Sequence, residues 1–398
     1  MIAHEALGAH SSTLYDELVD VRRALHETPE LSFHEVATTA LIRDRFRELG
    51  IQEHPCPTAT GAVFSLAGGR PGRTVLLRAD IDALPVEEES GLPFSSRMEG
   101  RMHACGHDVH TASLMGAASA LAAHADDLPG RFVFAFQPAE ETVSGAQAMV
   151  DGGLLEQFHP AVTIGYHVAS ALPTGFVVSR PGVLMAGVRG LRVSVRGSGG
   201  HGALQPRRGN VVLAVSRLAD RLDEVVADLQ TEGSDCVCSP GVINAGTAPN
   251  VVPTRAVLLG TLRFFESEQL TEAEGRLGRL AAEVGAEFDV EVTVEQTYRT
   301  DRVFNDAGVT EVALDAARAV VGAHQVLEAG SPVPASDDVS VFLDRLPGCY
   351  LLIGGALADG SSGNHHSPTF KVDEIAMRVG ATVLGVAAAE LAAGHPTP

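Results

Sequence analysis

Apolar residues recur along this chain at two spacings, and the spacing changes from one segment to the next. In residues 14–49 they recur every three or four positions on either side of Thr28-Pro29, which predicts two helices joined by a proline turn. Further helices are predicted at Asp108–Ala123, Thr310–Val321 and Val372–Ala392. Short apolar runs predict buried strands at Ala62–Leu66, Thr74–Arg78, Phe132–Phe136, Val162–Val168 and Cys349–Gly355. Strands that alternate with helices indicate an α/β fold with a largely parallel sheet.

Residues 190–297 follow a different pattern of strand, helix, two strands, helix and strand. The predicted elements are Leu191–Arg196, Asn210–Leu229, Val237–Asn244, Ala256–Phe265, Glu268–Val284 and Asp289–Thr297. This βαββαβ order is a self-contained unit of the size of a small domain. Because the α/β pattern resumes after it, we expect one domain built from residues 1–187 and 300–398, with an α+β domain inserted at residues 188–299.

Length and composition agree with two folded domains. The 398 residues exceed the roughly 250–300 at which single cores stop growing. A content of 45% hydrophobic and 20% charged residues is typical of a globular protein. The 29 Lys and Arg against 50 Asp and Glu leave a net charge of −21, and the sequence contains no Lys/Arg-rich run. This balance argues against nucleic acid and anionic membranes as partners.

The cysteines and the N-terminal segment indicate that the protein resides in a reducing compartment. Five sparse cysteines, an odd number, do not resemble a disulfide framework and favour a reducing environment. The N-terminal residues show no basic segment followed by an apolar one, so we expect no secretory signal. The apolar stretch Val379–Ala389 has 11 residues, fewer than the roughly 18–20 that span a bilayer. We therefore expect a cytoplasmic protein that does not cross a membrane.

The densest polar cluster lies at residues 101–110 and contains three histidines, one cysteine and one aspartate. Thiolate, imidazole and carboxylate groups together suit borderline metals such as zinc. Cys105 and His107 stand two residues apart just before a predicted helix and can point at one site, so we expect both to bind metal. His103 and His110 are expected to support the ligands or to be structural. A lone cysteine, in contrast, is often only a small buried apolar residue.

Two adjacent carboxylates, Glu140 and Glu141, follow the predicted strand Phe132–Phe136. Neighbouring side chains in an extended segment diverge, so one can bind a metal while the other reaches a water beside it. This division suits metal-assisted hydrolysis. The alternative is that both are acidic residues at the start of a helix around Ser144–Val150.

Three more histidines extend the set of candidate ligands. His167 ends the predicted strand Val162–Val168, and the pair His365-His366 lies in Gly-Asn-His-His-Ser-Pro. Five ligands suit two ions that share a bridge better than one tetrahedral structural ion, and two-metal sites are typical of hydrolases. Cys236-x-Cys238 has no nearby histidine and is expected to be structural.

Seven motifs in order make the chain similar to the M20 metallopeptidase family. The resemblance is to its aminoacylase-like amidohydrolase branch, which contains hippurate hydrolases, N-acyl-amino acid deacylases and indole-acetyl-amino acid hydrolases. The motifs span nearly the whole chain and are His26-Glu-Thr-Pro-Glu-Leu-Ser-Phe, Arg78-Ala-Asp-Ile-Asp-Ala-Leu-Pro, Met102-His-Ala-Cys-Gly-His-Asp-Val-His-Thr, Gln137-Pro-Ala-Glu-Glu, Gly199-Gly-His-Gly-Ala, Ala248-Pro-Asn-Val-Val-Pro and His366-Ser-Pro-Thr-Phe.

The resemblance implies a zinc-peptidase-like α/β catalytic domain interrupted by a ferredoxin-like lid that usually forms a homodimer. It also implies two divalent metal ions per subunit, held by Cys105, His107, Glu141, His167 and His366. Glu140 would be the catalytic base, and Asp82 would orient a ligand. Asn250 would lie near the substrate, and His201 would stabilise the oxyanion, usually in the partner subunit's site. On the sequence alone, His201 among its glycines is a surface histidine in a tight turn.

The implied activity is hydrolysis of N-acyl amino acids to a carboxylic acid and a free amino acid. Glu140 would take a proton from a water activated by the ions and pass it to the leaving nitrogen. Zinc or manganese is expected, and cobalt or nickel also suits the ligands. A dipeptidase is one alternative, and a non-catalytic binding protein of the same fold is another, although such a protein would be expected to lose its base or ligands. The chain departs from the branch at Ser336-Asp337-Asp338-Val339, where Ser-Glu-Asp-Phe is common, and this bears on the shape of the substrate pocket.

Overall fold

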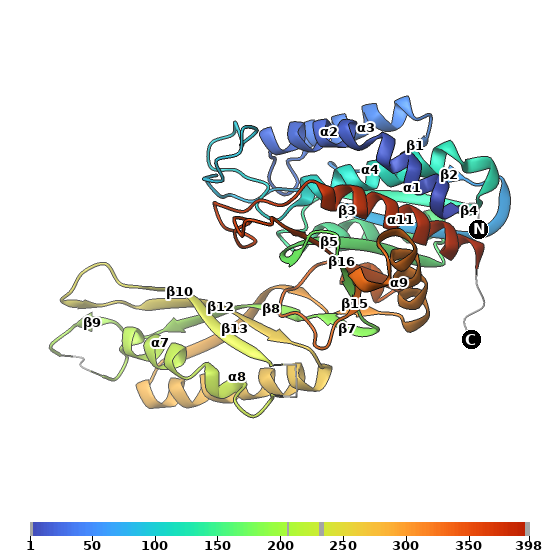
Figure 1. Ribbon diagram of the computed structural model, residues 1–398. Coiled ribbons are helices and arrows are strands. Elements are labelled where there is room, and N and C mark those ends of the chain that lie inside the picture. Colours follow the sequence, from blue (N-terminus) through green and yellow to red (C-terminus); the bar gives the residue numbers. More distant parts are fainter. Residues whose placement is uncertain (1–2, 205–206, 231–234, 395–398) are drawn as a thin grey trace. The chain divides into compact units, whose positions relative to one another are not determined.

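The computed structural model describes residues 3–204, 207–230 and 235–394, which form two compact units (Figure 1). The first unit comprises Met1–Leu184, Val303–Ala329 and Asp338–Pro398, and the second comprises Met185–Arg302 and Gly330–Asp337. The expectation that residues 300–398 belong wholly to the larger domain is wrong for Gly330–Asp337. This segment joins the second unit because Met185 pairs with Val333 in a β-bridge and the Arg263 guanidinium donates to the Pro334 carbonyl at 3.0 Å.

A mixed sheet of eight strands forms the centre of the first unit, in the order β1-β2-β4-β3-β5-β16-β6-β15. The strands are β1 (Gln52–His54), β2 (Ala62–Ala67), β3 (Arg70–Asp80), β4 (Pro129–Gln137), β5 (Val162–Pro173), β6 (Val177–Ser179), β15 (Val326–Glu328) and β16 (Gly348–Ala356). The central strands β4, β3, β5 and β16 run parallel, as the alternation of strands and helices predicts. Two short strands, β7 (Gly182–Met185) and β14 (Val303–Asn305), form a separate pair.

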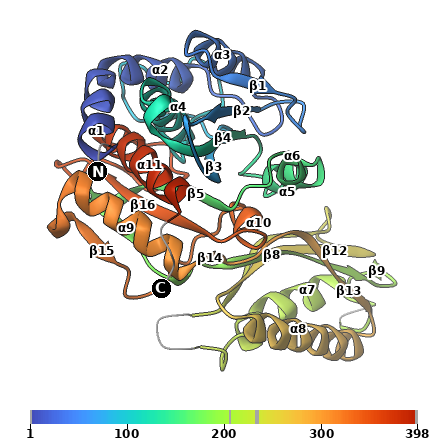
Figure 2. The same cartoon turned by 90° about the vertical axis from the view of Figure 1, so that its right-hand side faces the viewer.

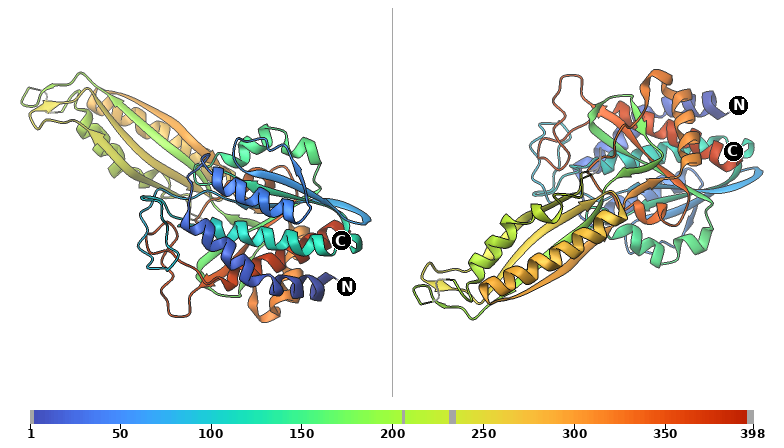
Figure 3. Two further views of the ribbon diagram at one scale, coloured as in Figure 1. Left: turned by 90° about the horizontal axis from the view of Figure 1, so that it is seen from above. Right: turned by 90° about the horizontal axis from the view of Figure 1, so that it is seen from below.

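Helices surround this sheet, and α4 and α11 run side by side against it (Figure 3). The helices of the first unit are α1 (Ala3–Thr13), α2 (Tyr15–Glu27), α3 (Val36–Glu48), α4 (His107–Ala123), α5 (Gly145–Asp151), α6 (Leu154–Phe158), α9 (Ala307–Val321), α10 (Ser340–Leu343) and α11 (Ile375–Ala393), with 3₁₀ turns at Ala125–Asp127 and Ala323–Gln325. The strands and helices expected for this unit are confirmed, each to within a few residues at its ends. The structure adds α1 and replaces the short turn expected between the first two helices with the longer segment 28–35.

Helix α11 is longer than the apolar stretch Val379–Ala389 suggests. It has 19 residues, and among the described residues it is the one helix long and apolar enough to cross a membrane. The apolar stretch begins after Arg378, but the helix continues through this residue. The Arg378 side chain is exposed, while the residues on both sides of it are buried. Since 83% of the most apolar window of α11 is buried inside the protein, the helix has the burial of a core helix.

The second unit is an antiparallel sheet in the order β10-β12-β8-β13, and two helices cover one of its faces (Figure 2). Its main elements are β8 (Gly187–Arg196), α7 (Val211–Asp220), β10 (Val237–Ala245), β12 (Arg255–Phe264), α8 (Ser267–Phe288) and β13 (Glu291–Thr300). Two short strands, β9 (Gly200–His201) and β11 (Val251–Val252), pair with each other. The expected α+β insertion with βαββαβ order is confirmed.

One element of this unit is shorter than expected. The helix predicted at Asn210–Leu229 ends at Asp220, and a 3₁₀ turn follows at Asp223–Val225. Leu222 and Val225 are nevertheless buried in the core under the sheet. The apolar pattern therefore predicts correctly which residues are buried. It does not distinguish a helix from a turn, because both can bury residues at this spacing.

Phe46 illustrates how the helices are held to the sheet of the first unit. Its ring is fully buried and stacks on Phe64 of β2 at a centroid distance of 4.1 Å. It also makes edge contacts with Phe134 and Phe136 of β4 at 5.6 and 5.2 Å. Aromatic clusters of this kind add to the free energy of burial through their ring geometry.

We expect Phe46→Ala to lower the free energy of unfolding by about 3–5 kcal/mol, because it removes a fully buried ring and leaves a cavity. The midpoint of denaturant unfolding, followed by circular dichroism, measures the effect. Phe304→Ala is the matched control, since the Phe304 side chain is 48% exposed. Equal midpoints for the two variants would show that Phe46 does not anchor α3.

Candidate metal centre

All five candidate ligands lie in the first unit. Cys105 precedes α4, His107 is the first residue of α4, and Glu141 follows β4. His167 lies inside β5 rather than at its end, because β5 continues to pair with β16 as far as Pro173. His366 lies in the loop before α11 and has a left-handed backbone with φ of 65°, a strained conformation that is often found at functional sites.

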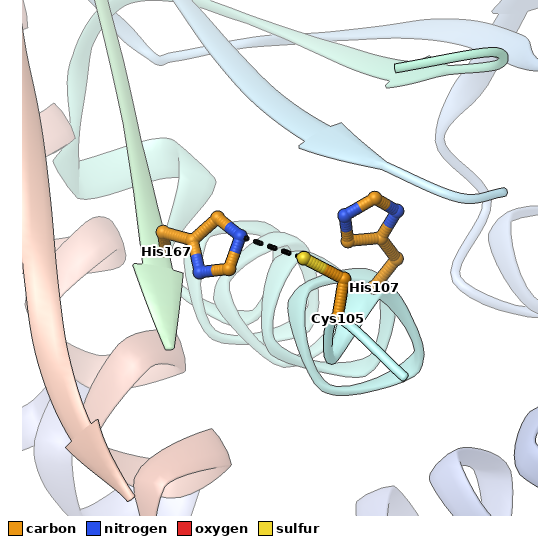
Figure 4. Close-up of side chains that lie close together, drawn as sticks. All are labelled: Cys105, His107 and His167. Carbon is orange, nitrogen blue, oxygen red and sulfur yellow. Dashed lines mark hydrogen bonds between the residues drawn. The ribbon is translucent and has the colours of Figure 1, made fainter. Parts of the chain in front are cut away.

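Gly106 allows its two neighbours to face one point. Its φ is +91°, and a Cβ placed on it would come within 2.5 Å of the Val168 Cγ1 atom. Only glycine fits this position without strain. The Cys105 sulfur therefore points from the turn at the start of α4 toward His167 on β5, and the His107 ring lies beside that sulfur (Figure 4).

The candidate ligand atoms form two overlapping groups of three. The ligand atoms of Cys105, His107 and His167 all lie within 4.8 Å of one another, and so do those of Cys105, Glu141 and His366. The Cys105 Sγ atom is 3.4 Å from the His167 Nε2 atom (Figure 4). Because Cys105 belongs to both groups, its sulfur is the atom that the two groups share.

The tautomers of His107 and His167 suit metal binding. The Nδ1 atoms of these residues lie 2.8 Å from the Asp82 carbonyl oxygen and 2.7 Å from the Val168 carbonyl oxygen, respectively. A carbonyl oxygen only accepts, so in the neutral form of each ring Nδ1 carries the proton and Nε2 presents a lone pair to the cluster. The His107 Nε2 atom is buried and has no hydrogen-bond partner among the described residues, as expected of a ligand atom.

Glu141, like His107, has a buried polar atom that suits a metal ligand. Its Oε1 atom is buried without a hydrogen-bond partner in the part of the chain that the structure describes, and it lies 3.8 Å from the His107 Nε2 atom. Its Oε2 atom is 3.5 Å from the His366 Nε2 atom. Burial raises the pKa of Glu141 to about 7, and the Asp82 and Asp80 carboxylates add to this effect, whereas His107 opposes it. A bound cation would provide the missing partner for both His107 and Glu141.

Glu140 lies beside these atoms but has other neighbours. Its Oε2 atom is 4.0 Å from the His107 Nε2 atom, and its Oε1 atom accepts a hydrogen bond from the Asp338 amide at 3.3 Å.

The alternative role for Glu140 and Glu141, as acidic residues at the start of a helix, is wrong. Helix α5 begins at Gly145, and its first turn contains no acidic residue.

Asp82 joins the two glutamates to His107. Its Oδ1 and Oδ2 atoms accept from the backbone amides of Glu140 and Glu141, each at 3.1 Å. The His107 Nδ1 atom lies 3.3 Å from Oδ1, and the Ser32 hydroxyl donates to Oδ2 at 2.7 Å. The geometry agrees with the orienting role expected for Asp82, whereas Ser32 was not anticipated.

Sequence reasoning also missed Asp80. Its Oδ1 atom is 2.6 Å from the His110 Nδ1 atom, and its Oδ2 atom accepts from the Arg78 guanidinium at 2.7 Å. Burial alone would raise the pKa of Asp80, but His107, His110 and Arg78 together hold it well below its ordinary value. The signal was present in Asp80-Ile-Asp82, because residues two apart at the end of a strand point to the same face.

His103, Cys236 just before β10 and Cys238 within β10 are not among the candidate ligands. The His103 ring is buried, neither of its nitrogens has a hydrogen-bond partner among the described residues, and burial lowers its pKa to about 4. Cys236 and Cys238 belong to none of the candidate metal-binding groups found in the described ranges. Burial raises their pKa values to about 11 and about 12, which leaves both as unreactive thiols.

His201 and Asn250 lie in the second unit, where the structure brings them together. His201 of β9 pairs with Val251 of β11, and the Gly202 amide donates to the Asn250 carbonyl at 3.0 Å. Both residues are exposed. The Ala203 amide donates to the His201 Nδ1 atom at 3.2 Å, so the neutral ring carries its proton on Nε2 and can donate from there.

Comparisons with known proteins agree with this picture. The chain is 36% identical over 376 residues to an N-acetyl-L-cysteine deacetylase of Bacillus subtilis, covering 94% of this chain and 88% of that protein. It is 32% identical to the Arabidopsis thaliana protein IAA-amino acid hydrolase ILR1-like 2, covering 94% of this chain and 85% of that protein. The crystal structure of the YXEP protein of Bacillus subtilis, described as a dinuclear metal binding peptidase from the M20 family, is similar with a TM-score of 0.81 at 30% identity, covering 96% of this chain and 99% of that one.

A family model also matches most of the chain. The model is that of peptidase family M20/M25/M40, and it matches residues 76–390. The matched range contains Asp82 and all five candidate ligands. Together with the relatives, this match shows that the chain belongs to peptidase family M20/M25/M40.

Proposed function

We propose that this protein is a metal-dependent amidohydrolase that cleaves N-acyl amino acids to a carboxylic acid and a free amino acid. One observation carries the proposal. The Cys105 sulfur is common to two groups of three candidate ligand atoms, and the carboxylate of Glu140 lies directly beside one of their members, His107. Two candidate cation sites next to a further carboxylate are the arrangement that metal-assisted hydrolysis uses.

Two divalent ions would be held by Cys105, His107, Glu141, His167 and His366. Zinc or manganese is the proposed metal, because the set combines thiolate, imidazole and carboxylate groups. When bound, the ions would lower the pKa of a water and polarise the carbonyl of the scissile amide. The buried His107 Nε2 and Glu141 Oε1 atoms, which lack partners among the described residues, support this assignment.

The chain's own residues would handle the protons. Glu140 would take a proton from the attacking water and deliver it to the amide nitrogen, which otherwise leaves poorly as an anion. Asp82 would keep the Glu140 carboxylate in place by accepting from the Glu140 backbone amide. The Nε2–H group of His201 would donate to the oxyanion, as its tautomer allows.

The proposed substrate class follows the names of the relatives. One is a deacetylase of an N-acetylated amino acid and another is a hydrolase of an acyl–amino acid conjugate. The structural neighbour is described as a peptidase, which favours a dipeptidase as the second candidate. Parallel assays of N-acetyl amino acids, N-benzoyl amino acids and unblocked dipeptides distinguish the two activities. Only a dipeptidase requires a substrate with a free amino terminus.

We also propose that the protein is a homodimer that associates through the second unit. One face of the β10-β12-β8-β13 sheet is not covered by α7 and α8, and two apolar side chains on its outer strands are exposed there. They are Val242 on β10, which is 42% exposed and pairs with Leu259, and Tyr298 on β13, which is 41% exposed. Exposed apolar side chains on an open sheet face are typical of an interface with another protein.

Removal of metal by a chelator is expected to abolish hydrolysis, and added zinc or manganese is expected to restore it, because the attacking water would depend on the ions. Hydrolysis of an N-acyl amino acid is measured together with metal content by elemental analysis. Full activity in a sample verified to be free of metal would contradict the proposal.

The neighbouring glutamates should fail in different ways. Glu140→Gln is expected to retain both metal ions and lose hydrolysis by roughly 10²-fold or more, as for a lost general base. Glu141→Gln is expected to lose metal, because it removes a ligand charge. Metal stoichiometry and turnover are measured for both variants. Loss of metal from Glu140→Gln with retention in Glu141→Gln would show that the two roles are reversed.

Mixing two inactive variants tests the proposed dimer and the role of His201. Glu140→Gln and His201→Ala subunits should recover part of the activity after subunit exchange, since some heterodimers would combine one intact base with one intact donor. Activity should be absent immediately after mixing and should rise as exchange proceeds, which tagged subunits can follow. A monomer in solution, or no recovery after confirmed exchange, would exclude a site shared between subunits.

A further inference from the structure

Strand β5 has two backbone donors that the sheet does not use. Its pairing with β3 ends at Ile164, whereas its pairing with β16 continues to Pro173. Beyond Ile164, the edge of β5 that faced β3 is open. Two amides in this part of the strand donate to imidazole rings instead of to a strand. The Val168 amide donates to the His110 Nε2 atom at 2.9 Å, and the Ser170 amide donates to the His365 Nε2 atom at 3.2 Å.

These two bonds determine where each ring carries its proton. A nitrogen that accepts a hydrogen bond holds no proton, so the neutral rings of His110 and His365 both carry it on Nδ1. Neither ring then has a lone pair left for a metal. This explains why two further histidines can lie next to the proposed ligands without being ligands themselves.

Both Nδ1–H groups face a proposed ligand or the acidic group beside the ligands. The His110 Nδ1 atom is 2.6 Å from the Asp80 Oδ1 atom. The His365 Nδ1 atom is 3.9 Å from the Cys105 Sγ atom, within the longer range of hydrogen bonds to sulfur. The donor from His365 would therefore be directed at a thiolate once Cys105 binds metal.

The same two rings enclose His167. The centroid of the His167 ring is 4.6 Å from that of His110 and 5.2 Å from that of His365. The ring planes cross at 74° and 70°, respectively, so His167 is packed edge-to-face between them. Its Nε2 atom remains 3.4 Å from the Cys105 sulfur.

We propose that His365 and His110 are positioning residues of the metal centre, held in their Nδ1–H tautomers by the Ser170 and Val168 amides. His365 would hold the Cys105 sulfur, His110 would hold Asp80, and the two rings would fix the orientation of His167. The inference rests on the proposed ligand roles of Cys105 and His167. Residues that orient metal ligands in this way typically contribute about 10–100-fold to metal affinity.

A matched pair of variants separates the two halves of the His365 interaction. In His365→Gln the longer amide can still accept from Ser170 but has no donor at the Nδ1 position. In His365→Asn the shorter amide keeps a donor near the Nδ1 position and loses the acceptor. His365 is preferred for the test because it is only partly buried, whereas His110 is 1% exposed and its variants are less certain to fold.

Zinc affinity is measured for the full-length protein by competition with a chelator, and cobalt-substituted protein is examined for thiolate-to-cobalt charge-transfer absorption. We expect His365→Gln to bind zinc about 10–100-fold more weakly and to shift that absorption band. His365→Asn should lose less affinity and keep the band nearer to its wild-type position. The unfolding midpoint of the metal-free protein should be unchanged in His365→Gln, which keeps an acceptor for the Ser170 amide, and slightly lower in His365→Asn, which loses it.

The outcomes distinguish this inference from the proposed function. If wild-type protein shows no thiolate-to-cobalt band, the proposed ligand role of Cys105 fails. If wild-type protein shows the band, and His365→Gln matches it in band position and zinc affinity, the positioning role is overturned. Equal losses in the Gln and Asn variants would also overturn it, because such losses would reflect packing and not the donor.

Discussion

The metal centre depends on one buried carboxylate, that of Asp82, which is 1% exposed. It accepts hydrogen bonds from the backbone amides of Glu140 and Glu141, one on each oxygen, and from the Ser32 hydroxyl. The His107 Nδ1 atom contacts both its carboxylate and its carbonyl oxygen. Hydrogen bonds to a buried carboxylate are stronger than those between neutral groups. Asp82 therefore ties the segment after β4 to the start of α4, so the proposed base and two proposed ligands cannot shift independently.

Burial explains why this cluster is suited to a cation. It raises the pKa of Glu141 to about 7, and it raises the pKa of the Cys105 thiol well above the ordinary value, with the nearby carboxylates adding to the effect. Both groups thus resist the charged forms that bind metal. A divalent ion would reverse that balance, since it stabilises carboxylate and thiolate together. The cost of assembling these groups away from water is offset only when positive charge is present.

A second buried network adjoins the centre through Asp80, which contacts both Arg78 and His110. The Arg78 guanidinium donates to Asp80 at 2.7 Å, to Gln137 at 2.7 Å, to the Tyr350 hydroxyl at 3.1 Å and to Asp338 at 3.0 Å. These contacts join β3, β4 and β16 through the Arg78 guanidinium.

The same network includes part of residues 336–339, where the sequence departs from the Ser-Glu-Asp-Phe that is common in the related branch. Asp338 is retained and belongs to this network, while Val339 is 1% exposed and is therefore part of the core.

The sequence by itself determined the features that depend on near neighbours. The alternation of strands and helices, the inserted βαββαβ unit and the convergence of Cys105 and His107 around Gly106 all follow from short segments. Tertiary structure alone decided which histidines keep a free lone pair. His365 is 260 residues from Cys105 in the chain, and its tautomer depends on the Ser170 amide of β5. No local sequence pattern specifies this tautomer. It depends on the part of β5 that extends beyond its pairing with β3, where the unpaired backbone amides meet side chains from distant segments.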